Sequence, residues 1–356
     1  MNISYFKYLS DPVDDSRLLL KAFKKDSDEI LDGILTGKHN WYPVIGGIPR
    51  MLIGDAKIEL LQRKREFLKK YKSKLNKKIS LEWNEAIKKI KDLSSFEKHQ
   101  QKTADSFAYE WKNIYQENDY EKNNFYHFLS PFIKEKDLKG MATLDIGCGS
   151  GRFTKWATLA STKVSFATDL GDSVEVAYKM TKHLNNVGIV QADIYHMPFF
   201  GVIDFAYSIG VLHHLPQPKE GFLSLSKVLK RGGKMLIWVY NRRNNNRALY
   251  FYEPLRAIFR HIPKPILYKI CYLPASLVHI WNILCKMLKL KKMPFSYYEN
   301  FPFNMKLNDS FDVLATPKSN YYYSEEIEEW FNDAKLHKVR SYEHSEAGIT
   351  CIGTHV

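Results

Sequence analysis

Residues 144–153 read LDIGCGSGRF, and this stretch decides the fold. The short apolar segment 142–146 predicts a strand, and residues 152–160 predict a helix. Between them stand glycines at positions 147, 149 and 151, which permit positive φ and let a ligand approach the backbone closely. A strand that ends in such a turn and opens a helix is typical of doubly wound α/β sheets, which bind ligands at the carboxyl ends of their strands.

The pattern continues outward from this turn. It predicts strands at 163–168, 188–191, 203–209, 234–240, 338–343 and 349–354, and helices at 173–184, 219–229 and 324–334. This alternation predicts a mostly parallel sheet with helices on both faces. We expect residues 123–356 to form this domain, with residues 241–323 as an insertion after the fifth strand.

Three carboxylates follow successive strands. The glycines lack the G-x-G-x-x-G spacing of dinucleotide sites, and Asp145 before them suits a cationic amine better than a pyrophosphate. Asp169 stands about 20 residues further on, where an acid meets the ribose of an adenosine cofactor. Asp193 is placed to accept from an adenine amino group while Ile194 packs on the ring. Each aspartate alone suits a turn or a cap, but all three at strand ends favour an adenosine site.

These motifs, with YSIGVLHHL at 207–215 and KRGGK at 230–234, resemble class I S-adenosylmethionine (SAM)-dependent methyltransferases with a methyltransferase-11/25-like core. The resemblance implies a Rossmann-like sheet of seven strands with the last antiparallel, SAM as cofactor, and methyl transfer as the reaction. The cofactor-binding residues that it implies are Asp145, Gly147, Cys148, Gly149, Gly151, Asp169, Leu170, Asp193, Ile194 and Ser208.

The pair His213-His214 follows the fourth strand, where the transferred methyl group is expected. A histidine titrates near neutral pH, so either ring is a candidate general base. The same rings could instead shape the pocket or bond to the backbone, and both interpretations stay open.

The N-terminal segment 1–55 resembles the Trm112-like zinc-ribbon segment fused to some bacterial methyltransferases, with Gly46-Gly47 as a hairpin turn. The cysteines of that pattern are missing, so we expect no metal. Residues 56–122 predict a basic helical linker, whose lysines form either a solvated face or an arm for an anionic partner. Residues 107–111, FAYEW, resemble a segment that covers the cofactor in such fusions, although ordinary aromatic packing explains them equally well.

Cysteine usage and hydropathy bear on location. None of the four cysteines forms a C-x-x-C pair, which argues against disulfides and a zinc ribbon. No signal peptide is recognisable, and polar residues interrupt the apolar run 266–284, which makes it a poor transmembrane helix. We expect a cytoplasmic protein, peripheral at the inner membrane surface.

The insertion mixes aromatic and basic residues, including Arg247, Phe251, Lys291 and Lys292. Such a segment suits a helix on an anionic membrane, a stacking surface for single-stranded nucleic acid, or a buried lid. We expect it to govern the acceptor. The predicted substrate-side residues are Tyr250, Arg256, Tyr321 and Tyr322.

A net charge of +14 predicts an anionic partner without naming it. The leading hypothesis is methyl transfer to a small, hydrophobic or lipid-linked acceptor beside an anionic membrane surface. The alternatives are an RNA (tRNA or rRNA) methyltransferase and a non-catalytic module that keeps the SAM fold. The sequence leaves the acceptor atom and the oligomeric state open.

Overall fold

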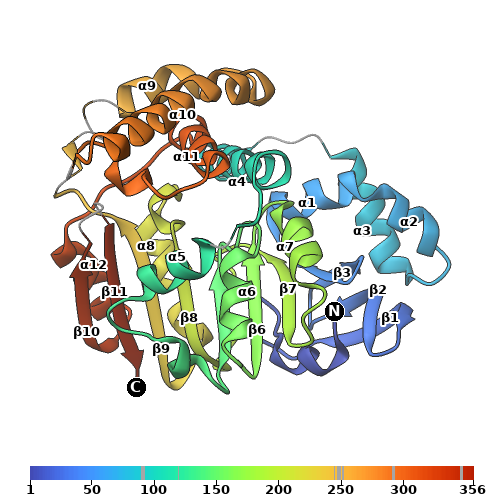
Figure 1. Ribbon diagram of the computed structural model, residues 1–356. Helices are drawn as coiled ribbons and strands as arrows, with labels where there is room; N and C mark the ends of the chain where they lie inside the picture. Colours follow the sequence, from blue (N-terminus) through green and yellow to red (C-terminus); the bar gives the residue numbers. More distant parts are fainter. Residues whose placement is uncertain are drawn as a thin grey trace.

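The computed structural model describes residues 1–89, 93–118, 120–243, 245–246, 250, 252–290, 293–344 and 348–356. In this part of the chain, one eleven-stranded sheet runs through the molecule in the order β1-β2-β3-β4-β7-β6-β5-β8-β9-β11-β10 (Figure 1). The strands are β1 (Leu19–Asp26), β2 (Glu29–Thr36), β3 (Trp41–Ile45), β4 (Ile48–Met51), β5 (Ala142–Ile146), β6 (Val164–Asp169), β7 (Val187–Ala192), β8 (Ile203–Ile209), β9 (Leu229–Tyr240), β10 (Leu336–Glu343) and β11 (Gly348–His355).

The helices surround this sheet. They are α1 (Gly54–Arg63), α2 (Arg65–Tyr71), α3 (Lys77–Lys88), α4 (Ser95–Asn113), α5 (Tyr120–Leu129), α6 (Arg152–Leu159), α7 (Ser173–Thr181), α8 (Pro218–Leu223), α9 (Glu253–Phe259), α10 (Lys264–Met287), α11 (Phe303–Ala315) and α12 (Ser324–Asp333). Short 3-10 helices are η1 (Ile3–Tyr8), η2 (Glu135–Leu138), η3 (Leu212–His214), η4 (Ser226–Val228) and η6 (Ser296–Tyr298).

Strands β5 to β11 form the predicted seven-stranded core. Strands β5 to β9 are parallel to one another, and β11 is antiparallel to both β9 and β10, as the resemblance implies. One element differs: the predicted helix 219–229 ends at Leu223, and β9 begins at Leu229 rather than Lys234. Buried Val228 and Leu229 join the core on either side of this boundary, so apolar burial continues across it.

Helices cover both faces of the core sheet. Helices α5, α6 and α7 lie on one face, where Phe125, Phe153 and Ala157 pack against Phe205 and Tyr207 of β8. Helices α8 and α12 contact each other on the opposite face, where Phe222 packs on Phe331 with ring centroids 4.6 Å apart. The two layers bury the strands and leave the carboxyl ends of β5 to β9 for a ligand.

The four N-terminal strands extend the sheet beyond β7. The hairpin of β3 and β4 turns at Gly46 and Gly47, both with positive φ, as the sequence predicts. Strand β4 then pairs in parallel with β7. Buried Arg50 of β4 reaches across this junction and donates to Gln191 Oε1 at 2.9 Å. Residues 1–55 therefore continue the core sheet instead of forming a separate layer.

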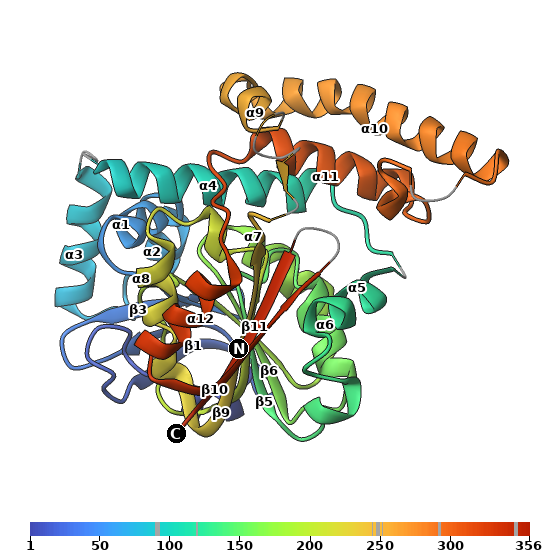
Figure 2. The same cartoon turned by 90° about the vertical axis from the view of Figure 1, so that its left-hand side faces the viewer.

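Helices α4, α9, α10 and α11 form a layer above the carboxyl ends of the strands (Figures 1 and 2), which we call the helical cap. Its own core joins α10 to α11 and α4, with Leu267, Cys271 and Phe311 fully buried. Part of the insertion therefore lies over the ligand-binding edge of the sheet. Arg247, Phe251, Lys291 and Lys292 of the insertion lie outside the described residues.

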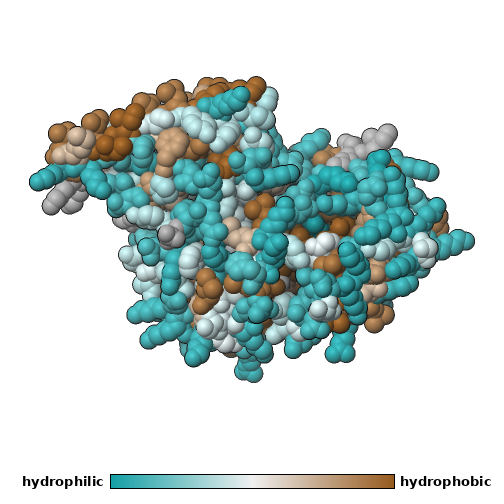
Figure 3. All heavy atoms as spheres, turned by 45° about the vertical axis from the view of Figure 1, so that its right-hand side comes forward, coloured by the Kyte–Doolittle hydropathy of each residue, from teal (hydrophilic) through white to brown (hydrophobic). Residues whose placement is uncertain are grey.

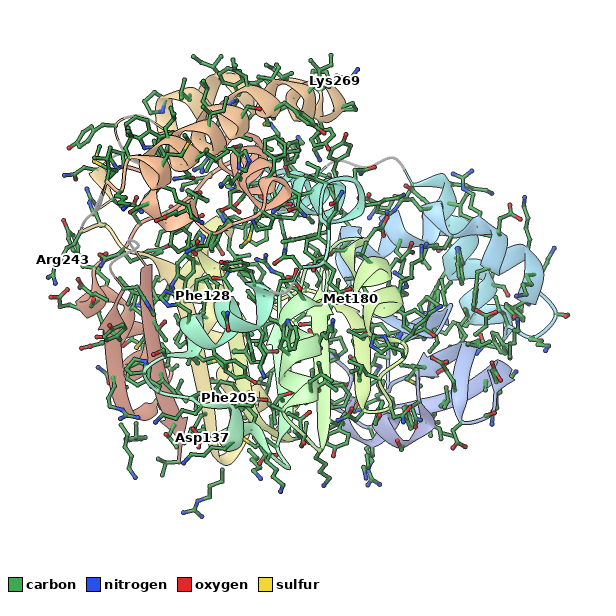
Figure 4. The ribbon with its side chains drawn as sticks, in the orientation of Figure 1. Phe128, Asp137, Met180, Phe205, Arg243 and Lys269 are labelled. Carbon is green, nitrogen blue, oxygen red and sulfur yellow. The ribbon has the colours of Figure 1, made fainter. Side chains whose placement is uncertain are left out.

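The outer face of α10 is apolar and exposed (Figure 3). Exposed fractions are 67% for Leu273, 60% for Leu277 and 74% for Met287. Figure 4 shows Lys269 on this outer side. Contrary to the sequence expectation, α10 is long and apolar enough to cross a membrane by length and composition, although 22% of its most apolar window is buried in the protein. The polar residues and the proline of this apolar run do not break the helix, since Pro274 lies within a continuous α10.

Candidate active site

A cavity lies between the carboxyl ends of the strands and the helical cap. Its empty volume is about 1200 Å³, including its opening to solvent. The strand-end loops supply one wall and helices α4 and α11 the other. Lining residues used below are Phe107, Glu110, Trp111, Gly147, Gly149, Arg152, Asp169, Leu170, Asp193, Ile194, Met197, His214, Trp238, Tyr240, Asn308, Asp309 and Asp312.

The glycine loop after β5 forms the floor of the cavity. Gly147 and Gly149 have φ of +76° and +53°, a region that side-chain-bearing residues rarely adopt. A Cβ on Gly149 would lie 2.6 Å from Trp111 Nε1 of α4, and a Cβ on Gly147 would collide with Val211. The loop therefore packs against Val211 and Trp111 so closely that neither position has room for a side chain, and its bare backbone lines the cavity.

Asp169 and Asp193, two of the predicted cofactor-binding residues, line the cavity. Asp169 accepts hydrogen bonds from the backbone N–H groups of Gly149 at 3.1 Å and Gly171 at 2.9 Å, which hold its carboxylate at the end of β6. Burial nevertheless raises the pKa of Asp169 above its ordinary value. Asp193 accepts from Gln100 Nε2 of α4 at 2.8 Å, so the cap is tied to the end of β7.

Leu170 and Ile194 also line the cavity, but four of the predicted cofactor residues do not. Asp145 is buried behind the glycine loop, where Thr154 Oγ1 donates to it at 2.6 Å. Cys148 packs in the apolar cluster under α7, and Ser208 donates to the carbonyl of Ile146 at 3.0 Å. Gly151 caps α6 with φ +81°. These residues support the loop from behind.

Asp145 has an unusual protonation equilibrium as a result. Burial, together with a smaller effect of the charge of Asp169, raises its pKa to about 7, against the hydrogen bond from Thr154. The structure does not place Asp145 for the expected direct contact with an amine, because its buried carboxylate does not line the cavity and accepts from Thr154 instead.

Of the two histidines, only His214 lines the cavity. Its Nδ1 lies 3.0 Å from the carbonyl oxygen of Lys318 and 3.2 Å from Ser319 Oγ. Burial lowers the pKa of both His213 and His214, so both rings are neutral near pH 7. The His213 ring lies on Tyr240, 3.9 Å between centroids, outside the cavity. The structure therefore does not place His213 where a general base is needed.

The four predicted substrate-side residues do not reach the cavity. Arg256 is buried in the cap, where it pairs with Glu253 and donates to the carbonyl of Val313. Tyr321 also donates to Glu253, at 2.9 Å. Tyr322 packs against Trp330 of α12, and Tyr250 is 80% exposed. The aromatic and basic composition predicted a binding surface here, but these side chains satisfy one another or solvent instead.

Polar residues of the cap take their place. Glu110 of α4 lines the cavity together with Asn308, Asp309 and Asp312 of α11. Helix α4 begins at a capping box between Ser94 and Glu97, a signal that the sequence carries. The spacing of residues 308, 309 and 312 would have put them on one face of a helix. Figure 4 shows Phe128 below this cap.

The described residues contain no group of three or more His, Cys, Asp or Glu side chains arranged to hold a metal ion. All four cysteines are free and buried. We predict that elemental analysis of purified, chelator-treated protein gives no stoichiometric zinc. One zinc per chain would contradict this prediction.

Comparison with known proteins identifies the core. The family described as "Methyltransferase domain" matches residues 144–237. The tRNA U34 carboxymethyltransferase of Pseudoalteromonas translucida (strain TAC 125) is 30% identical over 112 residues, which are 31% of this chain and 34% of that protein. The tRNA (carboxymethyluridine(34)-5-O)-methyltransferase of Schizosaccharomyces pombe (strain 972 / ATCC 24843) is 30% identical over 127 residues, 34% of this chain and 51% of that protein.

A solved SAM-dependent methyltransferase from Aquifex aeolicus is 16% identical, covers 70% of this chain and 98% of its own, and has a TM-score of 0.42. The chain thus spans about a third to a half of the curated relatives named above. None of these matches confirms the Trm112-like character of residues 1–55.

We predict that Asp169→Ala weakens binding of SAM and S-adenosylhomocysteine by about 1–3 kcal/mol, the cost of leaving buried hydroxyls without their acceptor. Isothermal titration calorimetry measures this loss. Asp333→Ala, an exposed site on α12 far from the cavity, is the control. Normal affinity in a folded Asp169→Ala variant would remove the ribose assignment.

The residues present fit the cofactor that the family implies. The glycine loop presents bare backbone to the cavity at Gly147 and Gly149, Asp169 presents a carboxylate, and Ile194 and Met197 offer apolar contact for a base. With the family match over residues 144–237 and the order of the seven core strands, the chain carries a class I methyltransferase domain that uses S-adenosylmethionine.

Proposed function

We propose that this chain methylates RNA, and that tRNA is its substrate class. The observation that carries the proposal is the match of its catalytic core to proteins named as acting on tRNA U34. This finding contradicts the leading hypothesis from the sequence, in which the acceptor is a small or lipid-linked molecule, because these relatives are named as acting on tRNA. The RNA alternative takes its place.

Charge supports the proposal. The net charge of +14 suits a polyanion, and helices α1 to α3 carry an exposed basic surface. Among the described residues, Lys72, Lys77 and Lys88 are exposed and take part in no ion pair, whereas Lys64 and Lys70 pair with Glu175 and Asp32. Unpaired lysines are free to neutralise phosphates and release counterions.

We predict that reversing Lys72, Lys77 and Lys88 to Glu weakens tRNA binding and lowers the salt dependence of binding. Each lost phosphate contact reduces the slope of log K against log salt by about 0.9. Affinity for S-adenosylhomocysteine should not change, because these lysines lie outside the cavity. Filter binding at several salt concentrations provides the measurement.

The matched control reverses Lys136, Lys139 and Lys163, which are exposed beside the starts of the central strands β5 and β6 and outside helices α1 to α3. Equal losses of tRNA affinity in the two triple variants would show that binding follows net charge alone. The function itself is tested by comparing the modified nucleosides of tRNA from wild-type and deletion strains. A methylated nucleoside should be missing from the deletion strain, and identical nucleoside profiles would refute the proposal.

The predicted cytoplasmic and membrane-peripheral location stays a prediction. So does control of the acceptor by the insertion, which Asn308, Asp309 and Asp312 support because all three lie within it and line the cavity.

A further inference from the structure

The cavity is acidic although the chain is basic. Its lining includes five carboxylates and one arginine, while the whole chain carries a net charge of +14. Asp169 and Asp193 belong to the strand-end wall described above. The other three, Glu110, Asp309 and Asp312, lie on the cap side and are here called the acidic wall. A cavity with this lining attracts cations and repels anions.

The acidic wall is built by helix packing. Asn308 Nδ2 donates to Glu110 Oε1 at 2.7 Å and joins α11 to α4, and Thr316 Oγ1 donates to Asp312 at 2.6 Å. Asn308 is 8% exposed, and its Oδ1 has no hydrogen-bond partner within the described part of the chain. A buried acceptor without a donor is costly, and a ligand with N–H groups would satisfy it.

The electrostatics point the same way. Burial raises the pKa of Glu110 well above its ordinary value, and the charge of Asp312 adds to this rise. Burial, together with Asp312, raises the pKa of Asp309 to about 7. The pKa of Asp309 is raised by the charge of Asp312 on the same helix and lowered by Arg152 of α6 and by a hydrogen bond with the Tyr298 hydroxyl of η6. The charge of Asp309 in turn raises the pKa values of Glu110 and Tyr240. Arg152 is the only guanidinium or ammonium group of the cavity lining within the described residues. Its single positive charge cannot neutralise all the carboxylates of the cavity.

We propose that the methyl acceptor is a basic amine nitrogen, which enters the cavity as an ammonium group and is held by the acidic wall. This inference rests on the proposed function in that the amine is carried by RNA. This acceptor differs from that of the Schizosaccharomyces pombe relative, whose name specifies an O-methyl transfer on carboxymethyluridine. A carboxylate acceptor would be repelled by the charge of Asp312 and by that of ionised Asp309.

The reaction needs one proton acceptor. The ammonium group first gives a proton to the Asp309 carboxylate, which can act as a base near neutral pH because burial brings its pKa to about 7. The freed lone pair forms the new N–C bond, and the C–S bond breaks with its electron pair left on sulfur. The product leaves as a methylated ammonium group, and Asp309 returns its proton to water.

The first experiment identifies the acceptor chemistry. Purified protein is incubated with methyl-tritiated SAM and, separately, with total tRNA and with the small-molecule fraction of a deletion strain. Labelled tRNA is digested to nucleosides, and every labelled product is treated with mild alkali and passed over a cation exchanger at pH 7. We expect alkali-stable label that the exchanger retains. Alkali-labile label would reveal a methyl ester, and unretained label a neutral ether or amide, and either result would overturn the amine assignment.

This design separates the two proposals. Retained label in the tRNA fraction supports both. Retained label only in the small-molecule fraction supports the amine and refutes RNA as the substrate class. Alkali-labile label in tRNA supports RNA as the substrate class and refutes the amine.

The second experiment tests the acidic wall, with the fraction that takes up label in the first experiment as the acceptor. Asp309→Asn and Asp312→Asn should change the affinity for S-adenosylhomocysteine by less than about threefold, because the wall is assigned to the acceptor. Loss of a positioned base should lower the methylation rate by about 100-fold or more. Asp309→Asn should also remove the rise of the wild-type rate with pH up to about 7. Asp105→Asn, exposed on α4, is the control. A tenfold loss of cofactor affinity in either wall variant would assign these acids to the cofactor and overturn the proposal.

Discussion

Phe311→Ala should abolish methyl transfer and leave the sheet folded. The Phe311 side chain is fully buried in the core of the cap, beside Leu267 and Cys271 of α10. It also stacks on Tyr109 of α4, with ring centroids 5.6 Å apart. Truncation of such a residue costs about 3–5 kcal/mol. The helices that carry the acidic wall would lose their common anchor, while the clusters that bury the sheet contain neither Phe311 nor its cap neighbours.

Hydrogen exchange measures this separation directly. Amides of α10 and α11 should lose protection in the variant, while amides of β5 to β8 keep theirs. Leu277→Ala, on the exposed face of the same α10, is the matched control and should leave exchange and activity unchanged. Equal loss of protection in cap and sheet would show that the two form one cooperative unit, against this account.

Asp145→Asn should stabilise the protein, and more so at high pH. Burial raises the Asp145 pKa to about 7, whereas an unfolded aspartate titrates near 3.9. Between these values the native state holds a proton that the unfolded chain releases, so wild-type stability falls as pH rises from about 4 to 7 and levels above it. The amide avoids this cost, and its oxygen still accepts from Thr154.

The expected gain in the free energy of unfolding is about 1–2 kcal/mol at pH 5 and about 4 kcal/mol at pH 8, the latter an upper bound from the shift in pKa. Urea denaturation at the two pH values measures it. Asp333→Asn, at an exposed carboxylate, controls for the removal of one charge. A variant less stable than wild type at pH 8 would mean that Asp145 is ionised in the native state and has a partner there.

The core was predictable from sequence because each strand ends in a local signal. Gly147 and Gly149 require positive φ, and Asp169 and Asp193 close their strands, so register and site follow from neighbouring residues. The extra strands β1 and β2 gave no such signal. They carry a mixed pattern, and their pairing with each other and with β3 is a tertiary event.

The cap side of the cavity was missed for a related reason. Glu110 lies in a segment that drew attention through its aromatics, and Asp309 and Asp312 lie in an insertion with an excess of basic residues. Only the packing of α4 against α11 brings these acids together. Composition likewise suggested Arg256 for substrate, but Glu253, three residues before it, neutralises its charge inside the cap.

The most direct test of the central claim is transfer of a labelled methyl group to RNA. The purified chain is incubated with methyl-tritiated SAM and total RNA from a deletion strain, and Asp169→Ala, which should bind SAM more weakly, is run beside it at the same limiting SAM concentration. The account predicts acid-precipitable label in the tRNA size range that ribonuclease treatment releases, with less label from Asp169→Ala. In a parallel reaction, a whole-cell lysate of the deletion strain replaces the RNA. Label in the organic-solvent extract of that lysate, while purified tRNA stays unlabelled, would contradict the account.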